Sequence, residues 1–153
     1  MFRSKEFIAG SIYFCYSDYR SHIGPTGVGA LRQNVHGVVD LYGRRKSSYA
    51  VLREECSPIE SLTAENRVNA FQLRLRTRQG IPMYILRGYK VRGILYGEGD
   101  VPMERQEAAL PEMVSGGEIT VDLKFSQSGV PVHVAFDVLR PTGFSAYSRD
   151  WKP

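Results

Sequence analysis

The sequence predicts a mainly β protein: an antiparallel β-sandwich over residues 58–153, preceded by a strand–loop–helix segment over residues 1–57. Three observations lead to this prediction. Apolar and polar residues alternate along several short segments of the second part, as they do in strands with one buried face. Turns that contain Gly and Pro separate these segments. In the first part, a long apolar run is followed by a glycine-rich loop and a helix-like segment.

The apolar run, FIAGSIYFCY over residues 7–16, contains no charged side chain. Such a run suits a strand that is buried on both faces, as in parallel sheets. A parallel strand followed by a crossover helix is one unit of an α/β sheet, and it needs neighbouring strands. Since no similar run stands nearby, we expect its partner strands to lie outside this chain.

A loop over residues 20–33 and a helix over residues 47–56 follow the apolar run. The loop is indicated by its glycines and its proline. A short apolar turn or strand is expected around residues 38–41. Ser47 suits the N-cap position of the helix, and Pro58 ends it. The apolar face of this helix is formed by Tyr49, Leu52 and Cys56.

Five segments of the second part read as strands of the sandwich. They are AFQLRLRTR, YKVRGILYG, ITVDLKFS, VPVHVAFDVL and GFSAYSRDW. The residues expected to face inward include Phe71, Leu73, Leu75, Ile119, Val121, Leu123, Phe125, Val132, Val134, Phe136 and Val138. The spacing suggests about six or seven strands, and about 95 residues is the usual size of an immunoglobulin-like module. We therefore expect an immunoglobulin-like sandwich.

Three stretches of the sequence resemble the C-terminal end of glycoside hydrolase family 2, the β-galactosidase and β-glucuronidase family. EFIAGSIYFCYSDYR is similar to the eighth strand of the family's (β/α)8 barrel. HGVVDLYGRRKSSYAVLREE is similar to the segment that leaves the active-site loop and enters the eighth helix. IPMYILRGYKVRGILYGEGD is similar to the third-strand region of the sandwich that follows the barrel. The matching positions are Gly10, Phe14, Cys15, Tyr16, Asp18, Gly37, Arg45, Lys46, Leu52, Arg53 and Glu54.

The resemblance covers nearly all of the chain. It implies that residues 1–57 are the terminal strand and helix of an incomplete barrel, and that residues 58–153 are the trailing immunoglobulin-like domain. A retaining glycosidase needs two carboxyl groups about 5–5.5 Å apart. In this family both are glutamates on earlier barrel strands, which would lie upstream of Met1. We therefore expect no catalytic residue here and no hydrolysis by this chain alone.

What remains by resemblance is one wall of a sugar pocket, because such sites form at the C-terminal ends of barrel strands. Phe14 occupies the family's floor position, usually a Trp, where it either stacks on a sugar ring or packs in the core. Asp18 either bonds a sugar hydroxyl or holds the loop. Asn34 and His36 stand where glucuronidases carry Asn-x-Lys. A neutral imidazole pairs poorly with a carboxylate, so we expect a neutral sugar such as galactose, unless His36 is merely an exposed loop residue.

Other classes of function are not indicated. The net charge of +4 is mild, and the arginines that alternate along residues 74–78 have no interleaved aromatics, so nucleic acid is not an expected partner. No apolar stretch is long enough to span a membrane. Three His and two Cys are scattered, so neither a metal nor a cofactor is expected. The expected location is the cytoplasm, or the periplasm if a missing N-terminus carried a signal.

A second interpretation belongs to another class of protein. The chain would be a free-standing β-sandwich that binds carbohydrate or contacts another protein or subunit, with residues 1–57 as an attached arm. An unpaired apolar strand associates readily with other chains. This interpretation therefore predicts a homo-oligomer, formed through residues 7–16.

Overall fold

The computed structural model describes residues 5, 7–21, 33–126 and 131–153. The chain divides into two compact units, Met1–Cys56 and Ser57–Pro153, each of which is considered by itself. The expected boundary, between residues 57 and 58, lies one residue further along. No helix within the described residues is long and apolar enough to cross a membrane.

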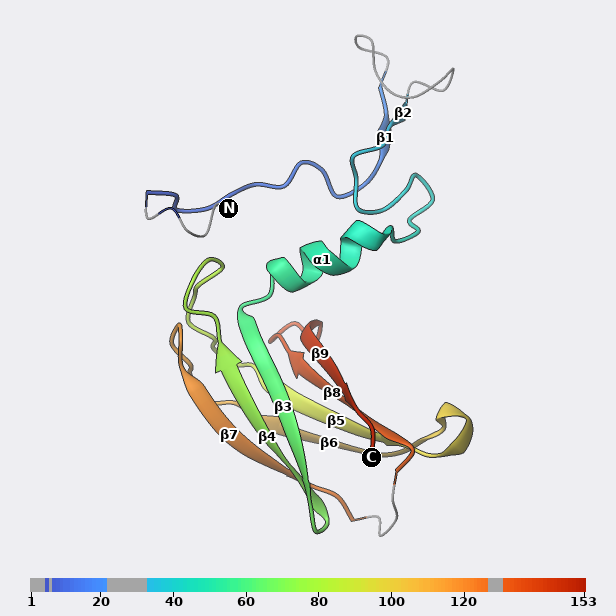
Figure 1. Cartoon of the computed structure of the whole chain (residues 1–153), viewed down its shortest axis with the longest axis vertical. Helices are drawn as coiled ribbons and strands as arrows, with labels where there is room; N and C mark the ends of the chain where they lie inside the picture. The colour runs from blue at the N-terminus through green and yellow to red at the C-terminus, as the bar shows by residue number, and fades with distance from the viewer. Residues whose placement is uncertain (1–4, 6, 22–32, 127–130) are drawn as a thin grey trace. The chain divides into compact units, whose positions relative to one another are not determined.

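The second unit is built from two antiparallel sheets, as predicted (Figure 1). The three-stranded sheet has the order β3-β4-β7 and the four-stranded sheet the order β6-β5-β8-β9. The strands are β3 (Ile59–Arg67), β4 (Ala70–Thr77), β5 (Lys90–Tyr96), β6 (Pro102–Ala109), β7 (Glu118–Lys124), β8 (His133–Leu139) and β9 (Ser145–Trp151). A short 3-10 helix, η2 (Glu98–Asp100), lies in the connection from β5 to β6.

The core of this unit is centred on Phe71 of β4. Its ring lies 5.3 Å from the ring of Phe136, 4.9 Å from that of Trp151 and 6.0 Å from that of Phe125. These contacts join the two sheets, because Phe136 and Trp151 belong to β8 and β9. The predicted alternation along β4 is confirmed, since Phe71, Leu73 and Leu75 are all buried. Aromatic rings at these spacings add to the stability that burial provides.

Two details of the predicted sandwich are wrong or incomplete. Val132 was expected in the core, but its side chain is 50% exposed, because β8 begins one residue later, at His133. Strands β3 and β6 were not identified. Both are edge strands that pair on one side only, with β4 and β5 respectively. Their mixed composition gives a weak alternation pattern.

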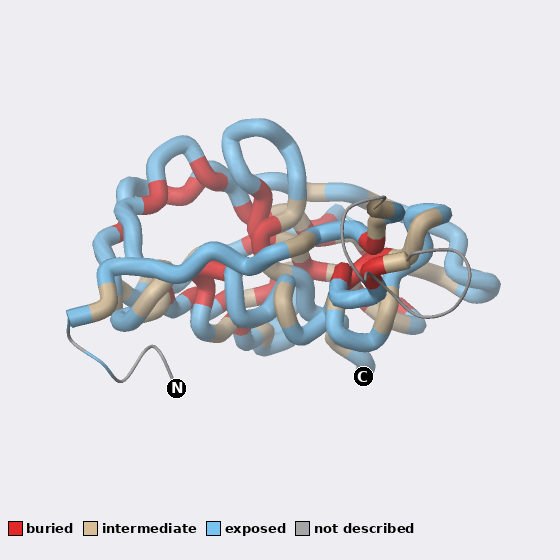
Figure 2. The backbone as a smooth tube through the Cα atoms, turned by 90° about the horizontal axis from the view of Figure 1, so that it is seen from above, coloured by how far each residue is buried: buried red, intermediate tan, exposed pale blue. Residues whose placement is uncertain are grey.

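The first unit contains little regular structure. Its elements are β1 (Tyr19–Arg20), β2 (Gln33–Asn34) and α1 (Ser47–Glu55). The expectation of a strand over residues 7–16 is wrong for this chain, which forms no strand there. Figure 2 shows this stretch mostly in the pale blue of exposed residues. The physical reason is that a strand requires a backbone neighbour. Among the described residues of the first unit, only Val38 and Val39 donate backbone hydrogen bonds to this stretch, and both bonds go to its last residue, Tyr16.

The helix and the turn before it follow the sequence more closely. The helix α1 forms as expected, but Lys46, not Ser47, stands at the N-cap, and it makes no side-chain cap bond. None of the residues of α1 is buried. In the expected apolar turn, Val38 and Val39 are buried. Val39 forms a parallel bridge with Ser17 and an antiparallel bridge with Arg45.

Candidate functional site

A set of polar contacts in the first unit surrounds Asp18, whose side chain is only 7% exposed. Its Oδ1 accepts a hydrogen bond of 2.9 Å from the backbone N–H of Gly37 and one of 2.6 Å from the Nζ of Lys46. The same ammonium group donates to the carbonyl of Val35 at 2.9 Å. We refer to Asp18, Gly37 and Lys46 as the Asp18 clamp.

Backbone hydrogen bonds hold the same three segments side by side. The N–H of Asp18 donates to Val39 O at 2.9 Å, and the N–H groups of Val38 and Val39 donate to Tyr16 O at 2.9 and 3.0 Å. The N–H of Lys46 donates to Val38 O at 2.9 Å. The end of the apolar segment, the loop after β2 and the start of α1 are therefore one connected structure.

In the sequence, Lys46 stands out only as one of the positions that carry the resemblance. The sequence does indicate that Lys46 is unusual, because a positive charge at the beginning of a helix opposes the helix dipole. The first turn of α1 carries no acidic residue that would offset it. Such a residue is expected to have a partner elsewhere, and the partner is Asp18, which lies 28 residues earlier.

Asn34 lies on β2 directly opposite Tyr19 of β1. Its side chain is buried, with 8% exposure, and its Nδ2 has no hydrogen-bond partner among the described residues. An unsatisfied buried donor costs free energy, on the order of 1–3 kcal/mol. The amide of Asn34 is therefore buried at a cost that the described residues do not offset.

Tyr19 is the centre of an aromatic cluster that sequence reasoning did not identify. Its ring makes edge contacts with the ring of Phe14, at 6.0 Å between centroids, and with the ring of His36, at 5.9 Å. Phe14 is 72% exposed, so in this chain it does not pack in a core. His36 is exposed, and its carbonyl accepts a 2.8 Å hydrogen bond from the hydroxyl of Tyr13.

The four predicted site residues thus have two different surroundings. Phe14, Asn34 and His36 are gathered around Tyr19, whereas the carboxylate of Asp18 is engaged by the clamp. Rings with exposed faces can pack against the apolar side of a sugar, and an amide can donate to a hydroxyl. The arrangement suits recognition of an uncharged polyol, and its described residues include no nucleophile paired with a base.

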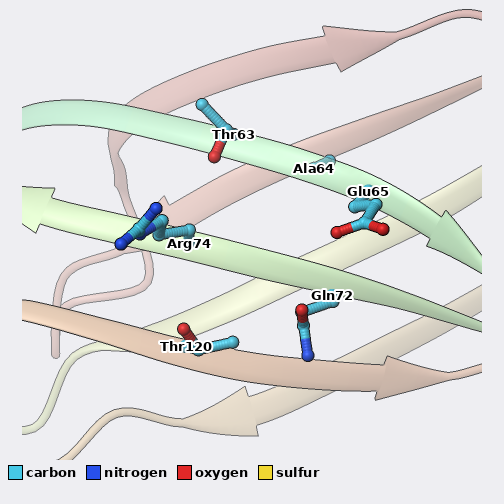
Figure 3. Close-up of a pocket in the computed structure, with 6 residues that line it drawn as sticks. All are labelled: Thr63, Ala64, Glu65, Gln72, Arg74 and Thr120. Atoms are coloured by element: carbon cyan, nitrogen blue, oxygen red, sulfur yellow. The ribbon is translucent and has the colours of Figure 1, made fainter.

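The second unit has an open polar depression of about 300 Å³ on the three-stranded sheet (Figure 3). It is lined by Thr63, Ala64, Glu65, Gln72, Arg74 and Thr120. Its polar groups are engaged with neighbours: the Nε of Arg74 donates to Glu118 at 2.5 Å, and the Nε2 of Gln72 donates to Asp122 at 3.3 Å. No aromatic ring lines it.

The sequence matches none of the family models and none of the curated proteins with which it was compared.

Proposed function

We propose that this chain is the C-terminal portion of a family 2 glycoside hydrolase that acts on β-linked neutral sugars, most like a β-galactosidase. Residues 1–57 are the last strand and helix of its (β/α)8 barrel, and residues 58–153 are the trailing immunoglobulin-like domain. The chain supplies one wall of the sugar pocket. The two catalytic carboxylates belong to earlier strands of the barrel.

The observation that carries the proposal is the exposure of the uncharged segment 7–16. The side chain of Ile12 is 97% exposed, that of Phe7 83% and that of Phe14 72%. A continuous exposed apolar segment of this kind marks a surface that another structure covers. A barrel covers a strand with neighbouring strands on both edges and with helices on its outer face.

The helix α1 supports the same interpretation. It follows the apolar segment in the order strand, loop, helix, which is the repeating unit of a (β/α)8 barrel. It has no buried residue, and Val51 on its surface is 61% exposed. A nine-residue helix gains most of its stability from packing, so a barrel wall would supply what α1 lacks here.

The position of the Asp18 clamp also fits a barrel site. Asp18 follows the apolar segment, at the end where the strands of such barrels carry their functional loops. Strand β2 and the loop after it bring Asn34 and His36 to the same place, beside Tyr19 and Phe14. A histidine at position 36, where glucuronidases of the family carry a lysine, favours a neutral sugar over a uronic acid.

The second unit supports the trailing-domain part of the proposal. It has the size and the two-sheet arrangement of an immunoglobulin-like module. Its fourth strand, β6, pairs with β5 and so joins the four-stranded sheet. Strand β5 is its third strand, and it lies within the stretch 81–100 that resembles the third-strand region in the family.

The proposal is tested by the coding sequence and by activity. Translation upstream of Met1 should yield a barrel with two strand-end glutamates, and a stop codon close upstream would contradict this. The full-length parent should release nitrophenol from a nitrophenyl β-galactoside, whereas the purified chain should release none. Turnover by the chain alone would overturn the assignment of the carboxylates to missing strands.

A second candidate function is that of a carbohydrate- or protein-binding sandwich, and the polar depression on the three-stranded sheet favours it. The second unit has a core of its own, as a free-standing module requires. Titration of the chain with neutral oligosaccharides separates the two candidates. A Gln72→Ala substitution would weaken binding at the depression, and Asn34→Ala would weaken binding at the barrel-type site.

A further inference from the structure

We infer that Lys46 is a positioning residue: its ammonium group holds the loop that carries Asn34 and His36, and this engagement restricts the site to an uncharged sugar. The loop part of the inference stands on the geometry of the first unit. The sugar part rests on the proposed function.

The loop of residues 34–37 is held at two points by one side chain. The Nζ of Lys46 donates to the carbonyl of Val35 at 2.9 Å. It also donates to Asp18 Oδ1 at 2.6 Å, and that same oxygen accepts the N–H of Gly37 at 2.9 Å. The ammonium therefore fixes both sides of His36, one side directly and the other through the carboxylate. Charge-assisted hydrogen bonds of this length are the strong ones.

The anchor itself is rigidly placed. Lys46 stands at the N-cap of α1, and its N–H donates to Val38 O at 2.9 Å. Its side chain is 30% exposed, compared with 7% for Asp18, so the pair is partly withdrawn from water. Removing one partner of such a pair leaves a poorly solvated charge. The loop should therefore depend on Lys46 more strongly than it would on a lysine in a fully exposed ion pair.

The engagement of Lys46 also decides the charge of the ligand. An ammonium beside a sugar site is the natural partner of a uronic acid carboxylate, but here a carboxylate of the chain occupies it. Arg45 lies over the ring of Tyr49, 4.6 Å from its centroid. Arg20 pairs across the ribbon with Gln33, so it projects from the face opposite Asn34. These cations do not stand ready for a sugar carboxylate beside Asn34.

The experiment compares Lys46→Met and Lys46→Arg in the whole chain by amide hydrogen exchange. We expect Lys46→Met to speed exchange at Gly37, Val38 and Val39 by about tenfold or more, because it removes a charge-assisted anchor. Lys46→Arg keeps the charge and donors and should restore most of the protection. The matched control is Lys90→Met, which removes a lysine that lies 3.7 Å from Glu107 in the other unit; it should leave these amides unchanged.

Three results would overturn the positioning role, of which the first two concern Lys46→Met alone. The first is unchanged exchange at these amides in Lys46→Met. The second is loss of protection that extends to the sandwich strands, which would show a global effect and not a local one. Equal loss in Lys46→Arg and Lys46→Met would also contradict it, because the charge would then not matter.

The ligand part is read from the side-chain amide resonances of Asn34 during titration with methyl β-galactoside and with methyl β-glucuronide. The galactoside should shift these resonances in the wild-type chain, and less so in Lys46→Met, whereas the glucuronide should not. A stronger response to the glucuronide would overturn the inferred substrate class. If neither sugar acts while the exchange pattern holds, the positioning role stands and the proposed sugar function fails.

Discussion

Gly37 approaches the backbone at Asp18 so closely that a β-carbon on it would stand 2.3 Å from the Asp18 nitrogen and 2.4 Å from the carbonyl carbon of Ser17. Real β-carbons do not come so close to backbone atoms, and here the neighbours cannot move aside as the end of a side chain would. The same glycine donates its N–H to Asp18 Oδ1 at 2.9 Å. Its lack of a side chain is thus what permits the clamp to close.

Gly37→Ala should therefore open the clamp. We expect faster amide exchange and faster proteolysis in the first unit, at residues 16–18 and 37–39, with no change in the sandwich. The matched control is Gly10→Ala, because nothing lies within 4 Å of a β-carbon at that position. A Gly37→Ala chain with unchanged protection would show that the two segments are not held together as described.

Gly93→Ala should destabilise the sandwich. Gly93 lies in β5, and a β-carbon there would meet Leu123 and Phe125 at 3.0 Å and Phe136 at 3.1 Å. Three buried neighbours must then shift together, so we expect a loss of about 1–3 kcal/mol in the free energy of unfolding, measured in urea. Gly80→Ala, which has open space around its β-carbon, should cost nothing measurable. Equal stabilities of the two variants would contradict the packing across the sheets.

The stability of the sandwich should depend on pH through Asp137. Burial raises the pKa of this carboxyl, but hydrogen bonds from Arg92 and from two serines together outweigh burial and hold the pKa below its ordinary value. The Nη2 of Arg92 lies 2.6 Å from Asp137 Oδ2. A lowered pKa in the folded state means that this stabilisation is complete above the unfolded-state value of about 4. It is lost as the pH falls through the folded-state value.

Asp137→Asn should accordingly cost about 2 kcal/mol at pH 7, and the difference from wild type should shrink as the pH falls below about 4. Urea unfolding at a series of pH values measures it. Glu112→Gln is the control, since Glu112 and its partner Arg87 are 52% and 70% exposed, and this pair should contribute little. A difference that grew on acidification would refute the direction of the shift.

Ile12→Lys tests whether the apolar segment is covered by anything within this chain. Because the side chain of Ile12 is 97% exposed, the substitution should change the free energy of unfolding by less than about 0.5 kcal/mol. It should also reduce self-association in sedimentation experiments, since a charge interrupts the exposed apolar run. If the proposed function holds, the same change in a full-length parent would place a charge within the barrel wall and prevent folding. A marked loss of stability in this chain would mean that Ile12 is already covered.

Many strands of the sandwich could be predicted from the local alternation of apolar and polar residues. The exceptions have physical causes. The alternation of Phe71, Leu73 and Leu75 requires only that one face of β4 be buried. Strand β6 contains Glu104 and Gln106, so its composition does not predict a strand. It forms because its backbone pairs with that of β5. Glu104 also accepts a hydrogen bond from the N–H of Ser126, which follows β7. Pairing of that kind depends on residues far away in the sequence.

The candidate site was predictable only in part. Phe14, Asp18, Asn34 and His36 could be named from the resemblance. The gathering of Phe14, Asn34 and His36 around Tyr19, with Asp18 engaged elsewhere, could not. The pairing of Asp18 with Lys46 joins positions 28 residues apart, and no local period relates them. A lysine at the beginning of α1 was the available clue, because the helix dipole disfavours it there.

The sequence by itself determined which segments are apolar on one face and where the chain must turn, because alternation and turn residues act over a few neighbours. It also determined that residues 7–16 carry no charge, and so that they suit a buried place. Only the tertiary structure decided that no described part of the first unit covers them, that Lys46 closes on Asp18, and that Gly37 must lack a side chain. These depend on distances between remote segments, which follow from the packing of the whole unit and not from the order of residues within any one segment.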